Sequence, residues 1–274
     1  MDIPDVLSFG NSHLEPDSKD GNLRGNVELQ EHVIDNYPKP NLPNINVPEH
    51  IIICLDICYD DQNALYRLGD GTTFTPINMM KRVLDFFIHS KHAVNKRTQF
   101  ALLVLKDSEA VWIHNFTNNV KDIITAIDHL KVEERNSESF DFNQVFQLLQ
   151  QTIEIEDCKQ GDTVLPPAYI IRMIVLFGRS NCMPHIPHDD EYFIFLKKHH
   201  YFYIDILFAH EEDCALYKCE EIYDNLQDLD DGYSYVFEVS KNPTKMHDNI
   251  AKLLAHPLQR PLQKNTNYNF GIRY

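Results

Sequence analysis

The chain has 274 residues, of which 43% are hydrophobic and 24% charged, and its formal net charge is -16. These values are typical of a globular protein with one large domain or two small ones. The strong negative charge argues against a nucleic-acid binder, which needs basic patches, and against binding to anionic membranes. No stretch approaches the roughly 20 apolar residues of a membrane-spanning helix.

The six cysteines are predicted to be free thiols. Cys54 lies in an apolar run and Cys219 in a helical pattern, where cysteine usually serves as a small buried hydrophobe. The opening residues, MDIPDVLSFG, lack the basic and long apolar regions of a signal peptide. We therefore expect a soluble protein of a reducing compartment, without a disulfide framework.

Residues 1–46 are predicted to form a disordered, acidic N-terminal tail. They are rich in Asp, Asn, Pro and Glu and show no sustained hydrophobic period. The sequence NYPKPNLPNINVP at the end of this region, with its four prolines, is typical of an extended leader into a first strand.

Residues 51–60, IIICLDICYD, predict the central strand of the fold. A strand with one polar face alternates between apolar and polar residues, whereas a parallel strand covered by helices on both faces is continuously apolar, as here. Asp56 would then lie at the carboxyl end of this strand, which is the edge where open α/β sheets usually bind ligands.

Strands and amphipathic helices alternate along the rest of the chain. Further strands are predicted at residues 100–107, 111–116, 169–178, 201–210 and 233–240. Helix caps are predicted at Thr75, at Asn118 or Asn119, at Asp141 and at Asn242. The first two of these further strands are close enough to form an antiparallel hairpin, and the last one is expected at an edge. The order predicts an α/β fold with a doubly wound sheet, mostly parallel with one antiparallel strand.

An aliphatic strand ending in Asp56, an early hairpin and six strands with intervening helices resemble the von Willebrand factor A (VWA) fold, over roughly residues 48–255. A more specific resemblance lies in the segments NVPEHIIICLD, FALLVLKD, LPPAYIIRMIV and above all AKLLAHPLQRP. These segments resemble the A-domain-like subunit, often called MERIT, of the BRISC and nuclear BRCA-A deubiquitinase complexes.

The resemblance implies a non-catalytic scaffold located in the cytoplasm and the nucleus. In that family the subunit stabilises an assembly whose zinc isopeptidase, a separate chain with an MPN-like partner, cleaves ubiquitin chains of one linkage. The resemblance also implies direct binding to the ubiquitin-conjugating-enzyme-like subunit, often called BRE. Composition sets the tail of residues 1–46 apart, and the resemblance covers the rest, with a VWA-like domain of residues 47–256 and a docking tail of residues 257–274.

The docking tail supplies the candidate partner-binding residues. They are His256, Pro257, Leu258, Gln259, Arg260, Pro261 and Leu262. Two prolines limit the freedom of the unbound segment, which lowers the entropy cost of docking. Arg260 suits a carboxylate or a pair of carbonyl groups. The alternative interpretation of this segment is a frayed terminus.

Metal-binding VWA domains carry D-x-S-x-S at the end of the first strand, with a Thr and an Asp from two further loops, as hard ligands for Mg²⁺ or Mn²⁺. In this chain Cys58 replaces the first hydroxyl and Asp60 the second, and the later turn GRSNCMP has no aspartate. We therefore expect a degenerate site without a cofactor, where Asp56 caps a turn through backbone N–H groups. A metal-dependent adhesion or ligand-binding module is the alternative function.

Catalytic motifs are missing from the sequence. Cys182, His185 and His188 lie within seven residues and invite zinc, but their spacing is unlike that of a two-knuckle site. The chain has no G-x-S-x-G elbow, no P-loop and no isopeptidase metal motif. We expect no enzymatic activity; the alternative, a zinc or thiol hydrolase, requires a reactive thiol.

Overall fold

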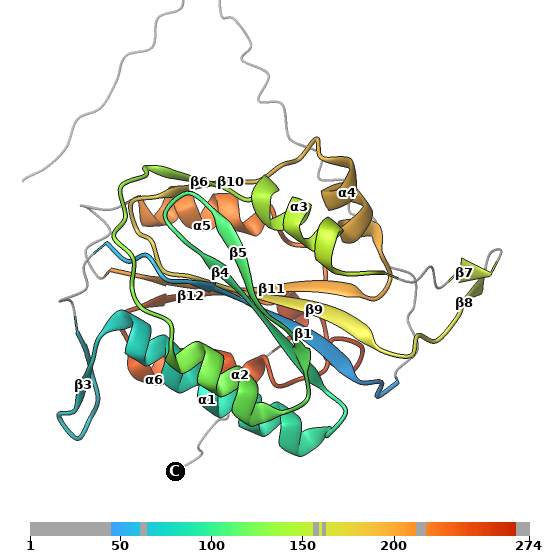
Figure 1. The fold of residues 1–274 in the computed structure, drawn as a ribbon, viewed down its shortest axis with the longest axis horizontal. Coiled ribbons are helices and arrows are strands. Elements are labelled where there is room, and N and C mark those ends of the chain that lie inside the picture. The colour runs from blue at the N-terminus through green and yellow to red at the C-terminus, as the bar shows by residue number, and fades with distance from the viewer. Residues whose placement is uncertain (1–44, 61–64, 156–158, 161–162, 212–217, 267–274) are drawn as a thin grey trace, which may run out of the picture. The chain divides into compact units, whose positions relative to one another are not determined.

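The computed structural model describes residues 45–60, 65–155, 159–160, 163–211 and 218–266. Within these residues a six-stranded sheet lies between two layers of helices (Figure 1). The predicted tail falls outside the described residues except for residues 45–46, and so do residues 267–274 of the predicted docking tail. Among the described residues, no helix combines the length and the apolar composition that crossing a membrane requires.

The central sheet has the order β12-β11-β9-β1-β4-β5. Its strands are β1 (Glu49–Asp56), β4 (Gln99–Leu105), β5 (Ala110–Thr117), β9 (Ile170–Phe177), β11 (Phe202–His210) and β12 (Val236–Ser240). Neighbouring strands are parallel except for the antiparallel β4–β5 hairpin. The predicted fold class is therefore confirmed: a VWA-like doubly wound sheet, mostly parallel with one antiparallel strand. The predicted edge position of β12 is confirmed as well.

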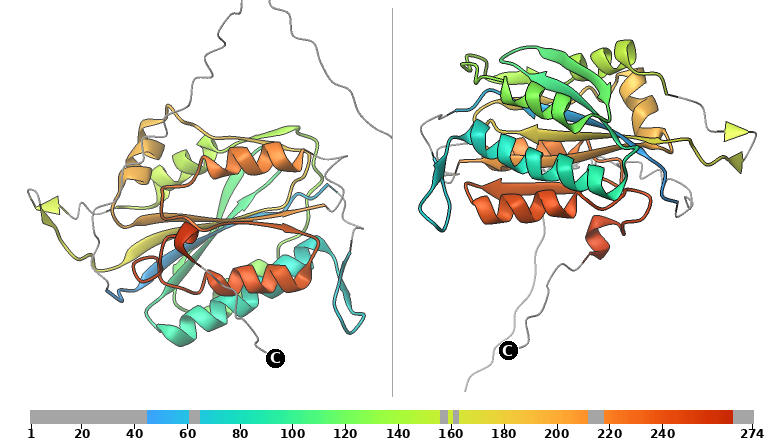
Figure 2. Two further views of the ribbon diagram at one scale, coloured as in Figure 1. Left: turned by 180° about the vertical axis from the view of Figure 1, so that it is seen from behind. Right: turned by 60° about the horizontal axis from the view of Figure 1, so that its bottom comes forward.

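Within the described residues, three helices cover each face of this sheet. The helices are α1 (Pro76–Val94), α2 (Val120–Asp128), α3 (Asn143–Thr152), α4 (Glu191–Lys198), α5 (Cys219–Gln227) and α6 (Pro243–Lys252), followed by a 3₁₀ turn at Gln263–Asn265. Helices α1, α2 and α6 lie on one face, and α3, α4 and α5 lie on the other (Figures 1 and 2).

Short strand pairs flank the central sheet. They are β2 (Tyr66–Arg67) with β3 (Thr73–Phe74), β6 (Ser139–Asp141) with β10 (Met183–His185), and β7 (Lys159–Gln160) with β8 (Thr163–Val164). The sequence did not predict them, because two or three residues are too few to show a period.

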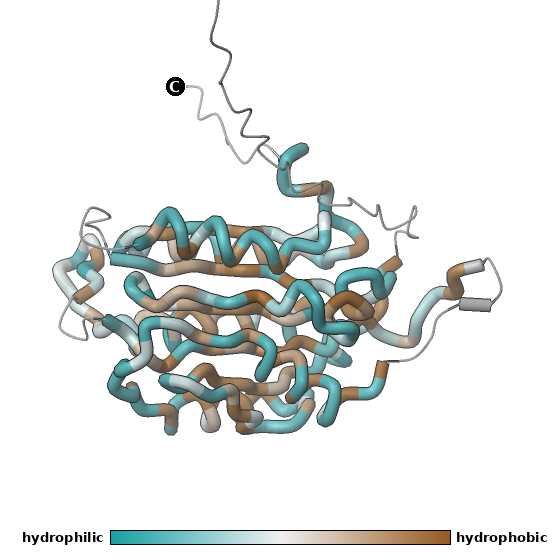
Figure 3. The backbone as a smooth tube through the Cα atoms, turned by 90° about the horizontal axis from the view of Figure 1, so that it is seen from above, coloured by the Kyte–Doolittle hydropathy of each residue, from teal (hydrophilic) through white to brown (hydrophobic). Residues whose placement is uncertain are grey.

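The continuous apolar run of β1 follows from its position between two cores. Ile51, Ile53 and Leu55 point into the core under α1, α2 and α6. Ile52 and Cys54 point into the core under α3, α4 and α5. Because successive side chains of a strand face opposite sides of the sheet, a strand covered on both sides must be apolar at every position. Figure 3 shows the resulting pattern, with apolar strands inside and polar residues along the outer helices.

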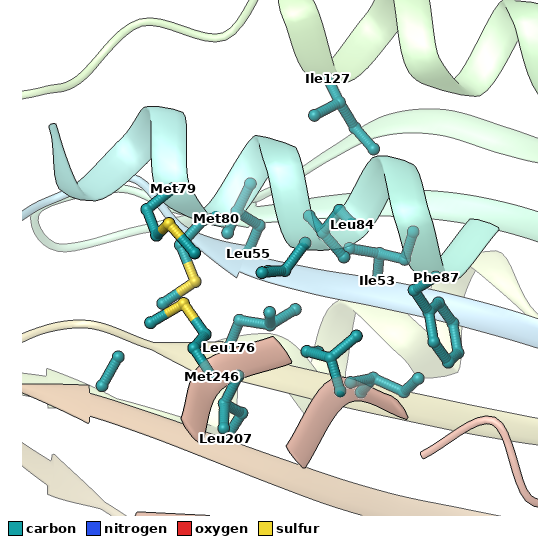
Figure 4. Close-up of a cluster of buried hydrophobic side chains, with 14 of the residues drawn as sticks. Ile53, Leu55, Met79, Met80, Leu84, Phe87, Ile127, Leu176, Leu207 and Met246 are labelled. Carbon is teal, nitrogen blue, oxygen red and sulfur yellow. The ribbon is translucent and has the colours of Figure 1, made fainter. Parts of the chain in front are cut away.

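Methionines fill the space between α1 and α6. Met79 and Met80 from α1 meet Met246 from α6 on this face of the sheet, beside Leu55 and Leu207 (Figure 4). All five side chains are at most 1% exposed. The unbranched thioether adapts to irregular gaps, which suits the space between two helices and the sheet that they cover.

Most of the predicted helix starts are confirmed. The Thr75 hydroxyl accepts a hydrogen bond from the Asn78 N–H at 3.4 Å, and Pro76 follows it at the first helical position. Asn119 and Asn242 cap α2 and α6 through their side chains. The cap predicted at Asp141 is wrong, because α3 begins at Asn143 after Phe142 and the Asp141 carboxylate caps only a turn before the helix.

Candidate functional site

The carboxyl edge of the sheet is built around Asp56, the last residue of β1. Its side chain is fully buried. One carboxylate oxygen accepts the N–H of Cys58 at 3.0 Å, and the other accepts the N–H of Gly178 at 3.0 Å. The predicted turn cap at Asp56 is therefore present. Arg179 Nε also lies 3.0 and 3.1 Å from the two oxygens, an ion pair that the sequence analysis missed.

The Arg179 guanidinium connects three loops of this edge. Besides Asp56, it donates to the carbonyl oxygens of Lys106 at 2.5 Å and of Asp107 at 2.9 Å. It lies 5.0 Å from the ring centre of Phe140, so its flat face is covered as well. Burial by itself lowers the pKa of Arg179, but the Asp56 carboxylate outweighs that effect and raises it.

Asp60 belongs to a second, neighbouring ion pair. One carboxylate oxygen accepts the backbone N–H of Ser180, and the other lies 2.8 Å from Arg135 Nε. The Asp107 carboxylate in turn accepts the N–H of Ser137 at 2.9 Å and its hydroxyl at 3.0 Å. These contacts connect the ends of β1, β4 and β9 to the loop before β6.

The residues of this edge do not fit a divalent metal ion. Both oxygens of Asp56 are already acceptors, and a cation beside them would meet the like charge of Arg179. Burial raises the pKa of the Cys58 thiol to about 12, which makes it a poor ligand. No cluster of three or more His, Cys, Asp or Glu placed to hold a metal occurs in the part of the chain that the structure describes.

The buried position of Asp56 makes its ionised form energetically costly. It raises the pKa of Asp56, although Arg179 and the N–H groups of Cys58 and Gly178 act in the opposite direction. Without those partners the carboxylate would be still harder to keep ionised inside the protein.

The residues considered for zinc are not brought together. Cys182 is fully buried, and its sulfur lies 3.7 Å from Nη1 of Arg179. His185 and His188 are exposed, and Nε2 of His188 lies 3.2 Å from the carboxylate of Asp228. The cysteine therefore faces the core while both imidazoles face outward.

The second candidate region is the segment after α6, where the predicted partner-binding residues lie. The side chain of Arg260 is buried and only 2% exposed. Its guanidinium donates to both oxygens of Asp205, at 2.5 and 3.0 Å, and to the carbonyl oxygen of Tyr233 at 2.9 Å. It also stacks 4.0 Å from the ring centre of Tyr235. Arg260 therefore has the predicted carboxylate and carbonyl partners, but they belong to its own domain.

Arg260 is one member of a buried network of five charges. Arg172 contacts Asp205 at 2.7 Å through Nε and Glu49 at 3.0 Å through Nη1. Lys91 forms an ion pair with the other oxygen of Glu49. Arg172 and Lys91 also donate to the carbonyl oxygens of Ala255 and Leu254, at 3.3 and 3.2 Å, so the network holds the chain that leaves α6.

Uncharged contacts complete the attachment of this segment. His256 Nε2 donates to the carbonyl oxygen of Val47 at 3.0 Å, and its Nδ1 accepts the N–H of Leu258 at 3.2 Å. The side-chain amide of Gln263 pairs with the N–H and the carbonyl oxygen of Val236, at 2.7 and 2.8 Å, along the free edge of β12. The described fold therefore continues through the C-terminal segment as far as Thr266.

Only part of the predicted docking segment is accessible. His256 and Pro257 are buried, Leu258 and Leu262 are partly buried, and Gln259 and Pro261 are exposed. A hollow of about 430 Å³ opens beside the segment. Gln259, Arg260, Pro261 and Thr266 are among the residues that line it.

Solved structures with a similar arrangement are distant. The VWA domain of SpRpn10 aligns with 78% of this chain and 99% of its own length, at 16% identity and a TM-score of 0.47. The PilB minor pilin from Streptococcus sanguinis aligns with 80% of this chain and 63% of its own, at 10% identity and a TM-score of 0.49. The strand order and pairing of this chain themselves define its fold.

Sequence comparison gives closer relatives, although no family model matches the chain. BRISC and BRCA1-A complex member 1 from Xenopus laevis is 32% identical over 233 residues, which cover 83% of this chain and 69% of the frog protein. The protein of the same name from Homo sapiens is 30% identical over 236 residues, with coverage of 83% and 69%. The Danio rerio protein is 32% identical and is covered over 62% of its length. The chain belongs to the family of BRISC and BRCA1-A complex member 1.

Proposed function

We propose that this chain is a non-catalytic scaffold subunit of a BRISC-like deubiquitinase complex and binds the BRE-like subunit directly. The observation that carries the proposal is the match to BRISC and BRCA1-A complex member 1 over 83% of this chain. The zinc isopeptidase and its MPN-like partner are then further members of the same assembly. The proposal includes a second, nuclear complex and a location in both cytoplasm and nucleus.

The geometry supports a role based on shape rather than on chemistry. At the carboxyl edge of the sheet, Asp56 and Asp60 are both engaged by arginines of the same domain. A thiol hydrolase needs a cysteine whose pKa is lowered, whereas burial raises the pKa of both Cys58 and Cys182. No observation favours the metal-dependent adhesion module, and the Asp56–Arg179 ion pair argues against it.

We place part of the partner surface on the segment from His256 to Leu262. Because Arg260 is held by Asp205, its role in this proposal is to fix the segment on the domain. The exposed residues Gln259 and Pro261 are left to contact the partner. A rigid, pre-ordered segment loses little entropy on binding, which favours affinity.

Co-expression of the full chain with the BRE-like subunit tests this proposal. We expect a complex that stays together through size-exclusion chromatography. Gln259→Arg places a long charged side chain on the proposed surface and should weaken binding at least tenfold without changing the melting temperature. Gln150→Arg, at an exposed position of α3, is the matched control and should bind normally.

Two further variants separate docking from folding. Deletion of residues 257–274 removes the segment together with the Arg260–Asp205 ion pair, and should abolish binding and also lower stability. Deletion of residues 267–274 alone keeps every contact described above. Full binding by Gln259→Arg and by the variant without residues 257–274 would show that the segment is not part of the interface. Failure of the intact chain to bind would reject the scaffold role.

A further inference from the structure

The carboxyl edge of the sheet contains a positive charge at the place where a metal-binding VWA domain needs a cation. Arg179 follows the carboxyl end of β9, directly beside the end of β1, and its Nε is 3.0 Å from the Asp56 carboxylate. Both side chains are 0% exposed. The charges are therefore paired away from water, where an unpaired carboxylate is costly.

The contacts of Arg179 resemble a coordination sphere in their distribution. They reach acceptors in three separate places: Asp56 at the end of β1, the carbonyl oxygens of Lys106 and Asp107 after β4, and the side chain of Cys182 in the loop of Arg179 itself. The fork of a guanidinium donates in several fixed directions at once. A single side chain can therefore hold the loops that a bound ion would otherwise draw together.

We propose that the Arg179 guanidinium is a built-in cation that replaces a divalent metal at this edge and locks its loops in one arrangement. The edge is then closed to Mg²⁺ and Mn²⁺, and the domain keeps its shape without them. This inference concerns the domain itself and is independent of which complex the chain joins.

A double-mutant cycle on the full chain tests the proposal. Arg179→Met removes the charge and keeps most of the bulk, so it leaves Asp56 buried and unpaired. Breaking a buried ion pair in this way lowers the melting temperature by about 10 °C in a domain of this size. Adding Asp56→Asn to Arg179→Met removes the stranded charge and should recover more than half of that loss. The melting temperature of Arg179→Lys should lie between those of wild type and Arg179→Met, because an ammonium group cannot reach Asp56 and both carbonyl oxygens together.

Arg135→Met is the matched control, because it removes the neighbouring ion pair between Arg135 and Asp60. The Arg135 side chain is 20% exposed, whereas that of Arg179 is fully buried. We expect a loss of only about 2–4 °C for this variant. The wild-type melting temperature should be the same in Mg²⁺, in Mn²⁺ and in EDTA, and the purified protein should contain no stoichiometric divalent metal.

Three results would overturn the proposal. One is a wild-type melting temperature that rises in Mg²⁺ or Mn²⁺ and falls in EDTA. Another is an Arg179→Met variant as stable as wild type. The third is a double variant no more stable than Arg179→Met, or equally insoluble. If Arg179→Met alone is insoluble and the double variant is soluble, the proposal stands.

Discussion

At the scale of single residues, the carboxyl edge shows what a local sequence pattern can and cannot reveal. Asp56 was predictable as a turn cap, because the strand ends there and Cys58 follows two positions later. Its ion pair with Arg179 was not predicted, because the two residues are 123 positions apart in the chain. A signal was nevertheless present: an arginine directly after a buried strand needs an acceptor, and the neighbouring strand ends in an aspartate.

Gly178 illustrates a second residue-scale constraint. A Cβ atom at this position would lie 2.4 Å from Cε1 of Tyr59. The Tyr59 ring is 5% exposed and its hydroxyl donates to the carbonyl oxygen of Asp56 at 2.9 Å, so the ring has little freedom to move. Overpacking of this kind costs about 1–3 kcal/mol. The glycine therefore allows the ring and the Asp56 turn to pack closely.

We predict that Gly178→Ala lowers the free energy of unfolding by about 1–3 kcal/mol, measured by urea denaturation. Gly69→Ala is the control, because nothing lies within 4 Å of the added methyl group there. Its effect should stay within about 0.5 kcal/mol. Equal stability of the two variants would contradict the packing argument.

At the scale of elements, the C-terminal segment behaves as part of the domain. The long amphipathic helices and buried strands were predictable because each repeats its period over many residues. The packing of the segment was not, since it depends on partners such as Val47 and Asp205 that are far away in sequence. Two prolines and two leucines in an otherwise polar stretch carry too little pattern to reveal a buried arginine.

Gln263 is predicted to protect the edge of the sheet. Its side-chain amide makes both hydrogen bonds that a neighbouring strand would make with Val236. We expect Gln263→Ala to cost about 1 kcal/mol and to speed amide hydrogen exchange at Val236. Lys264→Ala, at an exposed neighbouring position, should change neither quantity. Unaltered exchange at Val236 in the Gln263 variant would show that the amide pairing does not protect the edge.

The pH dependence of stability is predicted from two histidines, His50 near the start of β1 and His256 in the C-terminal segment. Burial lowers the pKa of His50 to about 4, and burial also lowers the pKa of His256. Groups with a lowered pKa in the folded state contribute stability above their ordinary pKa and lose it as the pH falls. We therefore expect the urea midpoint to decrease from about pH 6.5 toward pH 4.

Below that window, stability is expected to fall further through carboxylates with a lowered pKa, such as Asp205. Burial raises the pKa of Asp205, but Arg260 and Arg172 outweigh burial and hold that pKa below the ordinary value of an aspartate, so this contribution is lost only at still lower pH. His50→Phe keeps a ring stacked on Tyr169, 3.7 Å away between ring centres, and removes the titrating group. The urea midpoint of His50→Phe should fall less steeply between about pH 6.5 and 4 than that of wild type. An identical slope would mean that His50 does not contribute to the pH dependence.

At the scale of the whole molecule, buried ion pairs within the domain lie at both edges of the central sheet. The predicted alternation of strands and helices led to the correct sheet, because a strand apolar at every position is buried on both faces. The charge networks at the two edges of the sheet were not predictable in the same way. Each joins residues from several loops, and their pairing depends on the sheet order that only the structure shows.

Formation of the complex in the presence of a chelator tests the central claim most directly. The full chain is co-expressed with the BRE-like subunit and the pair is purified in EDTA. The molar mass of the complex is then measured by light scattering. The scaffold account predicts a stable complex with the same mass and affinity in EDTA and in Mg²⁺. A complex that forms only with the divalent ion, or no complex under either condition, would contradict it.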